Sequence, residues 1–347
     1  MTLASVVGHR RQTRLLSQAI ARGTLPPALL FIGPHGVGKF AVARATAATL
    51  NCLSPSTATD TRKGGADADV AIDACGRCRS CDRIARALHV DVFTLAPDEK
   101  ASIKIDVVRD VLSRTGFRPF EGKRRVVIIR EADTLEVAAQ NALLKSLEEP
   151  PPATVFILTS AVPSALLPTV LSRCMRLRFG RLTEREIETV LARDHELGAE
   201  DARQAAALAN GSVGQALALG STDMAVLRET AMALLSQNAS APVASRLQAA
   251  AVLSTSPSKK ERSREDVGLI LQMAASMLRD IELLNAGADV QSLANPGLVD
   301  DLQPLQRRYP GDRAREAFAA VDRAIVSLGR PHFAGIKVVC EWLAVRI

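Results

Sequence analysis

Residues 33–40 read Gly-Pro-His-Gly-Val-Gly-Lys-Phe, the spacing of a phosphate-binding P-loop. In the pattern G-x-x-x-x-G-K-[ST], backbone N–H groups surround phosphate oxygens, the lysine adds charge and the last hydroxyl binds Mg²⁺. The first two requirements are met by Gly33, Gly36, Gly38 and Lys39. Phe40 stands at the hydroxyl position and has no oxygen to offer. We expect a loop that can cradle phosphates but cannot hold the metal that hydrolysis requires.

A second magnesium position is also altered. The apolar run 126–129 reads as a buried strand, and P-loop ATPases place a metal-binding aspartate at the end of this strand. Here the residue is Arg130, while Glu131 survives where such enzymes polarise the attacking water. The alternative ligand, Asp133, lies too far beyond the strand for the same geometry. Two lost oxygens, far apart in sequence, predict that the chain does not hydrolyse ATP.

A cysteine cluster points to a metal site. Cys75, Cys78 and Cys81 follow the spacing C-x-x-C-x-x-C, and Cys52 lies upstream across residues 53–74. Four thiolates can close a tetrahedral structural Zn²⁺ site with no position left open for catalysis. An iron–sulfur cluster is the main alternative, because four cysteines serve either group, and redox switching is a third. Cys174 and Cys340 stand alone and are expected to be ordinary buried residues.

Strand and helix signals alternate in the first half of the chain, which predicts a parallel α/β sheet that positions the P-loop. The expected strands are 28–32, 90–95, 126–129, 154–159 and 175–179, the last alternating in polarity as an edge strand does. The expected helices are 39–50, 76–88, 106–115 and 135–148. The last of these should end before the prolines at 150–152.

Strand signals vanish after residue 180. Thr183-Glu184-Arg185-Glu186 is a capping box that opens a helix, and helical patterns continue to the C-terminus. The final helix carries an apolar stripe that we expect in a bundle core: Ile336, Val339, Cys340 and Leu343. The predicted domains are a P-loop domain at 1–180 with a cysteine module at 52–81, a small helical domain at 181–221 and a helical domain at 222–347.

Composition excludes some functions. Only 3% of the 347 residues are aromatic, which argues against a stacking platform for single-stranded nucleic acid. The net charge of +7 fits a protein that works beside nucleic acid, although the signal is weak. No signal peptide and no apolar run of about 20 residues is present, so we expect a soluble cytoplasmic protein without a membrane partner. In that compartment clustered cysteines favour metal over disulfides.

Several strings carry a family resemblance. The P-loop, the cysteines, Asn141–Pro151 (NALLKSLEEPP) and Leu171-Ser172-Arg173-Cys174 resemble bacterial clamp-loader AAA+ subunits of DNA polymerase III, over residues 1 to about 220. The string 89–97 (HVDVFTLAP) and the broken metal site look like the delta-prime branch of that family rather than its gamma/tau ATPase branch.

The resemblance implies a fold and a role. It implies an AAA+ P-loop domain with the zinc module, a helical lid and a C-terminal collar that builds a pentameric ring. Arg173 would be an arginine finger that reaches a neighbouring subunit's ATP site. The implied partners are gamma/tau and delta subunits, with the sliding clamp and primer-template DNA reached through the complex. Gly214 stands where active family members carry a sensing arginine. Whether ATP or ADP binds at all stays open.

Three functions compete at this point. The first is a non-hydrolysing subunit of the DNA polymerase III clamp loader that supports the ring and supplies Arg173 in trans. The second is an active gamma/tau-type ATPase, which Phe40, Arg130 and Gly214 disfavour. The third is a free-standing zinc-dependent DNA-binding protein, which a single compact cysteine cluster inside an α/β domain disfavours.

Overall fold

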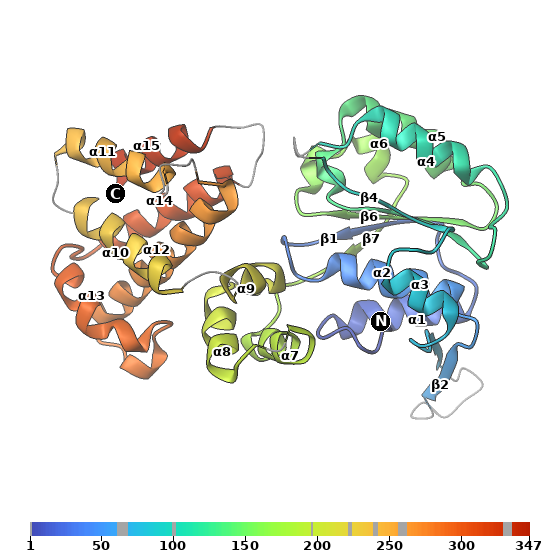
Figure 1. Cartoon of the computed structure of the whole chain (residues 1–347), viewed down its shortest axis with the longest axis horizontal. Coiled ribbons are helices and arrows are strands. Elements are labelled where there is room, and N and C mark those ends of the chain that lie inside the picture. The colour runs from blue at the N-terminus through green and yellow to red at the C-terminus, as the bar shows by residue number, and fades with distance from the viewer. Residues whose placement is uncertain are drawn as a thin grey trace. The chain divides into compact units, whose positions relative to one another are not determined.

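The computed structural model divides the chain into two compact units (Figure 1). It describes residues 2–60, 69–98, 102–195, 197–220, 224–238, 242–255, 262–328 and 335–347. The N-terminal unit comprises Met1–Arg193 and Gly211–Gly214, and the C-terminal unit comprises Asp194–Asn210 and Gln215–Ile347. The division into three domains stays a prediction, and its boundary at 221–222 lies outside the described residues.

A five-stranded sheet organises the N-terminal unit, in the order β4-β5-β6-β1-β7. Each neighbouring pair in it is parallel, as the alternation of strands and helices predicted. The strands are β1 Ala28–Ile32, β4 Val92–Leu95, β5 Arg125–Ile129, β6 Thr154–Ser160 and β7 Met175–Arg178. The alternating strand β7 lies at one edge, as expected, and β1 with its P-loop lies between β6 and β7.

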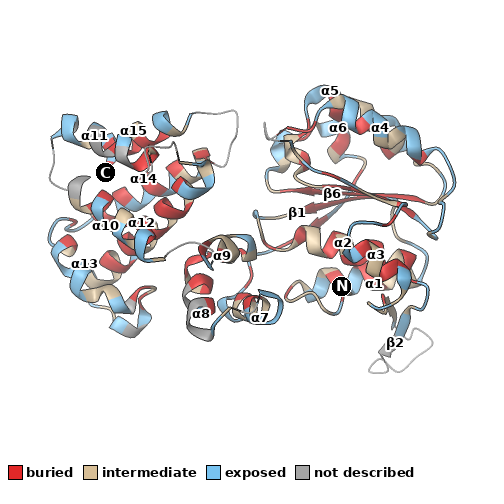
Figure 2. Ribbon diagram, viewed as in Figure 1, coloured by how far each residue is buried: buried red, intermediate tan, exposed pale blue. Residues whose placement is uncertain are grey.

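Both faces of the sheet are covered by helices, and this is why its central strands are almost wholly apolar. On one face pack α4 Ile105–Thr115, α5 Val137–Glu148 and α6 Pro168–Leu171. On the other lie α1 Arg10–Ala21 and α2 Lys39–Asn51, with α3 Arg79–Ala85 against α2. Successive residues of β1 alternate between the two cores, Leu30 in the first and Leu29 in the second. Figure 2 shows the buried sheet between helices with exposed outer faces.

Two predicted helices are shorter than expected. The helix predicted from 76 begins at Arg79, because residues Cys75 to Cys78 form a turn in which the Cys78 N–H donates to the Cys75 sulfur at 3.3 Å. The helix predicted from 135 begins at Val137. Leu135 instead forms an isolated parallel bridge with Ile103, and Glu136 N–H donates to the Ile103 carbonyl. The predicted strand 90–95 begins at Val92.

An antiparallel hairpin that the sequence did not predict occupies part of the stretch between Cys52 and Cys75. Its strands are β2 Ser56–Asp60 and β3 Asp69–Asp73, with Ser56 opposite Asp73. The carboxylate of Asp73 accepts hydrogen bonds from the N–H groups of Leu3 and Ala4, both at 2.8 Å. The hairpin thus returns the chain from Cys52 to Cys75 and anchors the N-terminal residues.

A buried ion pair organises the loop between α4 and β5. Asp91 is fully buried, and its carboxylate accepts from the N–H groups of Phe120, Glu121 and Gly122, each at 2.8 Å. Arg125 donates to Asp91 at 3.2 Å and to the carbonyls of Phe117 and Arg118. Burial alone would raise the pKa of Asp91, but these donors lower it further than burial raises it. The ionised pair therefore fixes the backbone of this loop.

The predicted capping box opens α7 Glu184–His195. Glu186 N–H donates to Thr183 Oγ1 at 3.3 Å, and Thr183 N–H donates to the Glu186 carboxylate at 2.9 Å. Just before this helix, Leu182 N–H donates to the Gly211 carbonyl at 3.0 Å. This bond holds the turn at 211–214, which precedes and begins α9 Val213–Gly220, within the N-terminal unit.

The C-terminal unit is helical throughout its described residues, as predicted. Its long helix α12 Arg264–Asn285 packs against α10 Met224–Asn238, α13 Val299–Gln306 and α14 Arg313–Leu328. Helix α15 Ile336–Arg346 packs against α14 and against α11 Val243–Ser254. In α15 the predicted stripe is buried at Val339, Cys340 and Leu343, with Ile336 half-buried. No described helix of either unit is both long and apolar enough to cross a membrane. Helix α8 Ala199–Leu208 also belongs to this unit.

Candidate functional site

The P-loop lies at the carboxyl end of β1, where an open α/β sheet places its ligands. Gly33 N–H donates to the Ser160 carbonyl at 3.2 Å, which ties the start of the loop to β6. Gly36 and Gly38 adopt the left-handed conformation, with φ of 69° and 101°. The loop therefore has the glycine-dependent curl that the sequence predicted, and it ends at the N-terminus of α2.

Lys39 turns back onto its own loop. Its amine donates to the carbonyls of Gly33 and Pro34, both at 2.6 Å. Burial lowers the pKa of Lys39 to about 8, although the carboxylates of Asp133 and Glu131 act in the opposite direction. The lysine is placed as a phosphate-binding residue would be, but here carbonyl oxygens take its hydrogen bonds.

Phe40 and Arg130, the two residues that the sequence pattern places at magnesium-ligand positions, contact each other. The guanidinium of Arg130 lies 4.6 Å from the centroid of the Phe40 ring, within the range of a cation–π interaction. Phe40 opens α2 and Arg130 directly follows β5, so the contact joins the two halves of the nucleotide site. A positive side chain and an aromatic ring thus lie together where two oxygen ligands for Mg²⁺ would be needed. The carboxylate of Asp133 accepts a hydrogen bond from Ala161 N–H at 3.0 Å.

Glu131, the residue that would polarise water, is paired with His35 of the P-loop. His35 Nε2 lies 3.5 Å from Glu131 Oε2. The hydrogen bond to Glu131 raises the pKa of His35, against the opposing effect of burial, and the same bond lowers the pKa of Glu131. The sequence analysis did not single out His35. The signal that could have found it is a titratable side chain at one of the variable positions of the P-loop motif.

The turn at residues 211–214 packs directly against the P-loop. Gly214 N–H donates to the Gly36 carbonyl at 3.1 Å. A Cβ atom on Gly36 would lie 2.2 Å from Ser212 Oγ, and one on Gly214 would lie 3.1 Å from the Gly36 Cα. Backbone contact thus occurs where the family resemblance implies an arginine in active members.

Arg173 lies at the amino ends of the strands, whereas the P-loop lies at their carboxyl ends. Strand β7 pairs in parallel with β1, so that Met175 is opposite Leu29 and Arg178 is opposite Ile32. Arg173 precedes Met175 and therefore lies beyond the amino end of β1, whereas Gly33 follows the carboxyl end. At about 3.3 Å per strand residue, the two are separated by on the order of 15–20 Å. The guanidinium is bonded to Glu148 through both Nε and Nη2.

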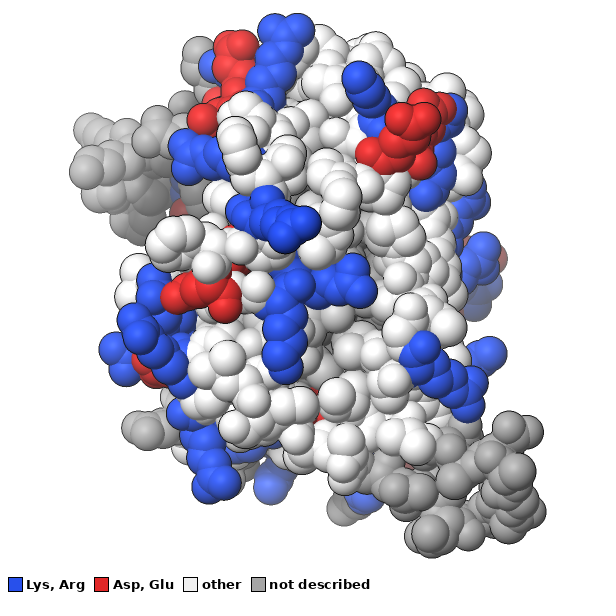
Figure 3. Space-filling view, turned by 90° about the vertical axis from the view of Figure 1, so that its right-hand side faces the viewer, with Lys and Arg blue, Asp and Glu red and all other residues white. Residues whose placement is uncertain are grey.

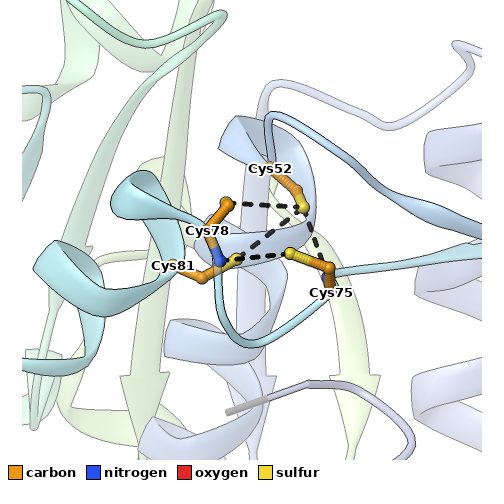
Figure 4. Close-up of side chains that lie close together, drawn as sticks. All are labelled: Cys52, Cys75, Cys78 and Cys81. Carbon is orange, nitrogen blue, oxygen red and sulfur yellow. Dashed lines mark hydrogen bonds between the residues drawn. The ribbon is translucent and has the colours of Figure 1, made fainter.

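The four predicted cysteines come together at one point between α2, the turn at 75–78 and α3 (Figure 4). Their sulfurs all lie within 4.8 Å of one another. The Cys52 sulfur lies 3.9 Å from that of Cys78 and 3.7 Å from that of Cys81. Tetrahedral zinc with Zn–S bonds of about 2.3 Å requires sulfurs about 3.8 Å apart. The cluster therefore has the dimensions of a four-thiolate metal site.

The surroundings favour the thiolate form at Cys75 and Cys78, whereas burial raises the pKa of the Cys52 and Cys81 thiols. Burial alone would raise the pKa of Cys78, but hydrogen bonds from the backbone of Cys81 and Leu53 lower it to about 6. Cys75 N–H donates to the Cys52 sulfur at 3.2 Å. N–H groups directed at sulfur stabilise negative charge, which is the form of cysteine that binds metal. Cys174 and Cys340 are buried elsewhere, as expected.

Comparisons with known proteins find similar sequences. The family model described as DNA polymerase III, delta subunit, matches residues 8–183. DNA polymerase III subunit delta' of Pseudomonas aeruginosa is 40% identical over 166 residues, which are 48% of this chain and 46% of that protein. DNA polymerase III subunit tau of Escherichia coli is 34% identical over 230 residues, 65% of this chain and 33% of that protein. The chain thus spans less than half the length of these relatives.

Distant likenesses occur among solved structures. A DNA polymerase III gamma subunit-related protein of Thermotoga maritima is 15% identical, covers 95% of this chain and 98% of its own, and has a TM-score of 0.43. At that score no conclusion rests on the likeness.

Proposed function

The chain belongs to the DNA polymerase III delta-subunit family, and from this premise we propose that it is a delta-prime subunit of the clamp loader. In this role it does not hydrolyse ATP. It supports the ring of loader subunits and supplies Arg173 to the ATP site of a neighbouring gamma/tau subunit, so that the sliding clamp is loaded on primed DNA. The 40% identity to the Pseudomonas delta' subunit favours this choice within the family.

The contact between Arg130 and Phe40 carries the proposal. A magnesium ion beside the P-loop needs oxygen ligands, and a guanidinium in its place repels a divalent cation. The ring of Phe40 holds that guanidinium within the site, 4.6 Å away. The pairing of Glu131 with His35 and the contact of Gly214 with Gly36 further support an inactive site.

The placement of Arg173 supports action in trans. Because it lies beyond the amino ends of β1 and β7, it is far from the P-loop of its own chain, which follows the carboxyl end of β1. A guanidinium so placed can stabilise phosphate charge only in another subunit, where an arginine finger is worth about 10³–10⁵ in rate.

The cysteine cluster is proposed to hold one structural Zn²⁺ through Cys52, Cys75, Cys78 and Cys81. The 3.7 Å and 3.9 Å distances between sulfurs support zinc, with no position open for a substrate. The proposed partners are gamma/tau and delta subunits, with the clamp and primer-template DNA engaged through the complex. The net charge of +7, and the predominance of Lys and Arg on the face seen in Figure 3, suit work beside DNA.

The runner-up is an active ATPase of gamma/tau type, which the 34% identity to Escherichia coli tau over 65% of this chain favours. The two functions predict different activities for the isolated chain. With Mg²⁺ and primed DNA, a delta-prime subunit should release no phosphate above background. Steady turnover that Lys39→Ala abolishes would establish the ATPase instead.

The proposed role in trans is tested in a reconstituted loader that contains this chain with gamma/tau and delta subunits. Arg173→Ala should leave assembly intact and lower DNA-stimulated ATP hydrolysis by at least about tenfold, because the finger acts on transition-state charge. Arg178→Ala is the matched control, since this exposed arginine lies at the other end of the same strand. If loaders with Arg173→Ala and with Arg178→Ala hydrolyse ATP and load the clamp equally well, Arg173 does not act in trans.

A further inference from the structure

The guanidinium of Arg173 is held by acceptors of its own chain. Its Nε donates to Glu148 Oε1 at 2.7 Å, and its Nη2 bonds the same oxygen. Its Nη1 donates to the Thr169 carbonyl at 2.8 Å. Contacts on all three nitrogens define the orientation of the fork, because a planar guanidinium bonded on two sides cannot rotate about its long axis.

Glu148 occupies a position that helix stability does not explain. It is the last residue of α5, followed by Glu149 and Pro150. A carboxylate at the C-terminus of a helix is disfavoured by the helix dipole. The pair with Arg173 is also partly exposed, 48% for Glu148 and 30% for Arg173, and exposed ion pairs add little to the stability of a fold. The contact therefore matters for geometry more than for folding.

Buried packing fixes the two elements that carry this pair. Gln140 of α5 is 2% exposed, and its amide nitrogen donates to the Ala165 carbonyl at 3.2 Å. Its amide oxygen accepts from Leu167 N–H at 2.7 Å, just before α6. Leu143 and Leu147 of α5 share a core with Val170 of α6. The end of α5 and the segment that carries Arg173 are thus rigid relative to each other, which is what a positioning contact needs.

We propose that Glu148 is the positioning residue for Arg173. It sets the direction of the guanidinium at the edge of the sheet before a neighbouring subunit binds, so that little side-chain entropy is lost when the arginine meets phosphate. This rests on the proposed function of Arg173 in trans. Positioning errors near 1 Å can cost a reaction about 10²-fold, so removal of the carboxylate should slow the neighbour's reaction while Arg173 is still present.

The test uses the full loader with Glu148→Ala, Glu148→Gln and, as the matched control, Glu149→Ala. Glu149 is the adjacent exposed carboxylate at the end of α5. Glu148→Ala should lower kcat for DNA-stimulated hydrolysis by on the order of tenfold with KM nearly unchanged. Glu148→Gln keeps an acceptor oxygen and should recover most of the loss. Glu149→Ala should match the wild type.

The Arg173→Ala variant separates the two claims. If it slows hydrolysis while Glu148→Ala does not, the finger stands and the positioning role of Glu148 is overturned. If Arg173→Ala has no effect, the proposed role of Arg173 in trans is overturned, and the proposed positioning role of Glu148 is overturned with it. In the positioning model, Glu148→Ala adds nothing in the Arg173→Ala background. A faster reaction in Glu148→Ala would show that the carboxylate restrains the arginine instead, and would also overturn the proposal. Glu148→Leu, which also removes the acceptor oxygens and is a good helix former, takes the place of Glu148→Ala in these comparisons should Glu148→Ala assemble poorly.

Discussion

The Arg130 guanidinium lies 4.6 Å from the centroid of the Phe40 ring, so two residues that are 90 positions apart meet beside the P-loop. The two side chains interact with each other, so a change at one of them affects the other. Phe40 alone would leave a metal site short of one ligand, and Arg130 alone would keep only its ion pair with Glu131, at 3.8 Å. Together they fill the position with an interaction that needs no ion.

This pairing predicts coupled effects on stability. Arg130→Gln and Phe40→Leu should each lower the free energy of unfolding, and part of each loss, about 0.5–1 kcal/mol, should belong to the shared contact. The double variant should therefore lose less than the sum of the single losses. Urea unfolding of the four proteins measures this coupling. Strictly additive losses would mean that the contact contributes nothing.

The cysteine cluster predicts one tightly bound zinc per chain. Metal analysis of protein purified without chelator should find it, and Cys78→Ser should release it and lower the thermal stability of the N-terminal unit, because the free energy of metal binding adds to that of folding. Cys174→Ser is the control, since this buried cysteine lies apart from the cluster and its loss should keep the metal. A wild-type protein that is fully folded without metal would contradict the assignment, and bound iron would favour the alternative cluster.

His35 should titrate above its ordinary pKa of 6.5, because its hydrogen bond with Glu131 favours the protonated ring. A group whose pKa is raised on folding stabilises the protein fully at pH values below its unfolded pKa. This stabilisation is lost as the pH rises through the folded pKa. The partner Glu131 has a lowered pKa, so its contribution is lost as pH falls through its folded value. The pair therefore stabilises the folded protein at pH values between the folded pKa of Glu131 and the folded pKa of His35. NMR titration of the histidine signals checks this, with His35→Gln for assignment. An unchanged His35 pKa in Glu131→Gln would refute the pairing.

The buried pair Asp91–Arg125 predicts a large loss on substitution. Asp91→Asn leaves the buried guanidinium of Arg125 without its counter-charge, and we expect a loss of about 3 kcal/mol in the free energy of unfolding. Asp110→Asn, which breaks an exposed pair with Arg114, should change it by less than about 0.5 kcal/mol. Because the lowered pKa of Asp91 makes its contribution present above the unfolded value near pH 4, the difference between the variants should vanish in acid. Equal losses at neutral pH would contradict this account.

Local patterns were sufficient to predict β1, the P-loop, the capping box at Thr183 and the cluster of four cysteines, since each depends on residues close in sequence or on one distinctive side-chain type. The hairpin at Ser56–Asp60 and Asp69–Asp73 escaped because its strands are only five residues long, and the first of them is almost entirely polar. The contacts of Phe40 with Arg130 and of Glu148 with Arg173 escaped for another reason. They depend on which strands and helices become neighbours, and no local signal in the sequence encodes that.

The register of β1 with β7 has an evolutionary consequence. Leu29 opposite Met175 and Ile32 opposite Arg178 place the P-loop and Arg173 at the two ends of one stiff pair of strands. Substitutions at Phe40 and Arg130 therefore change one end without moving the other. A lineage could lose its own metal chemistry by drift and still be under purifying selection for the arginine at the far edge. A duplicated gene whose product no longer hydrolyses nucleotide could in this way keep only the function of supplying Arg173 to a neighbouring subunit.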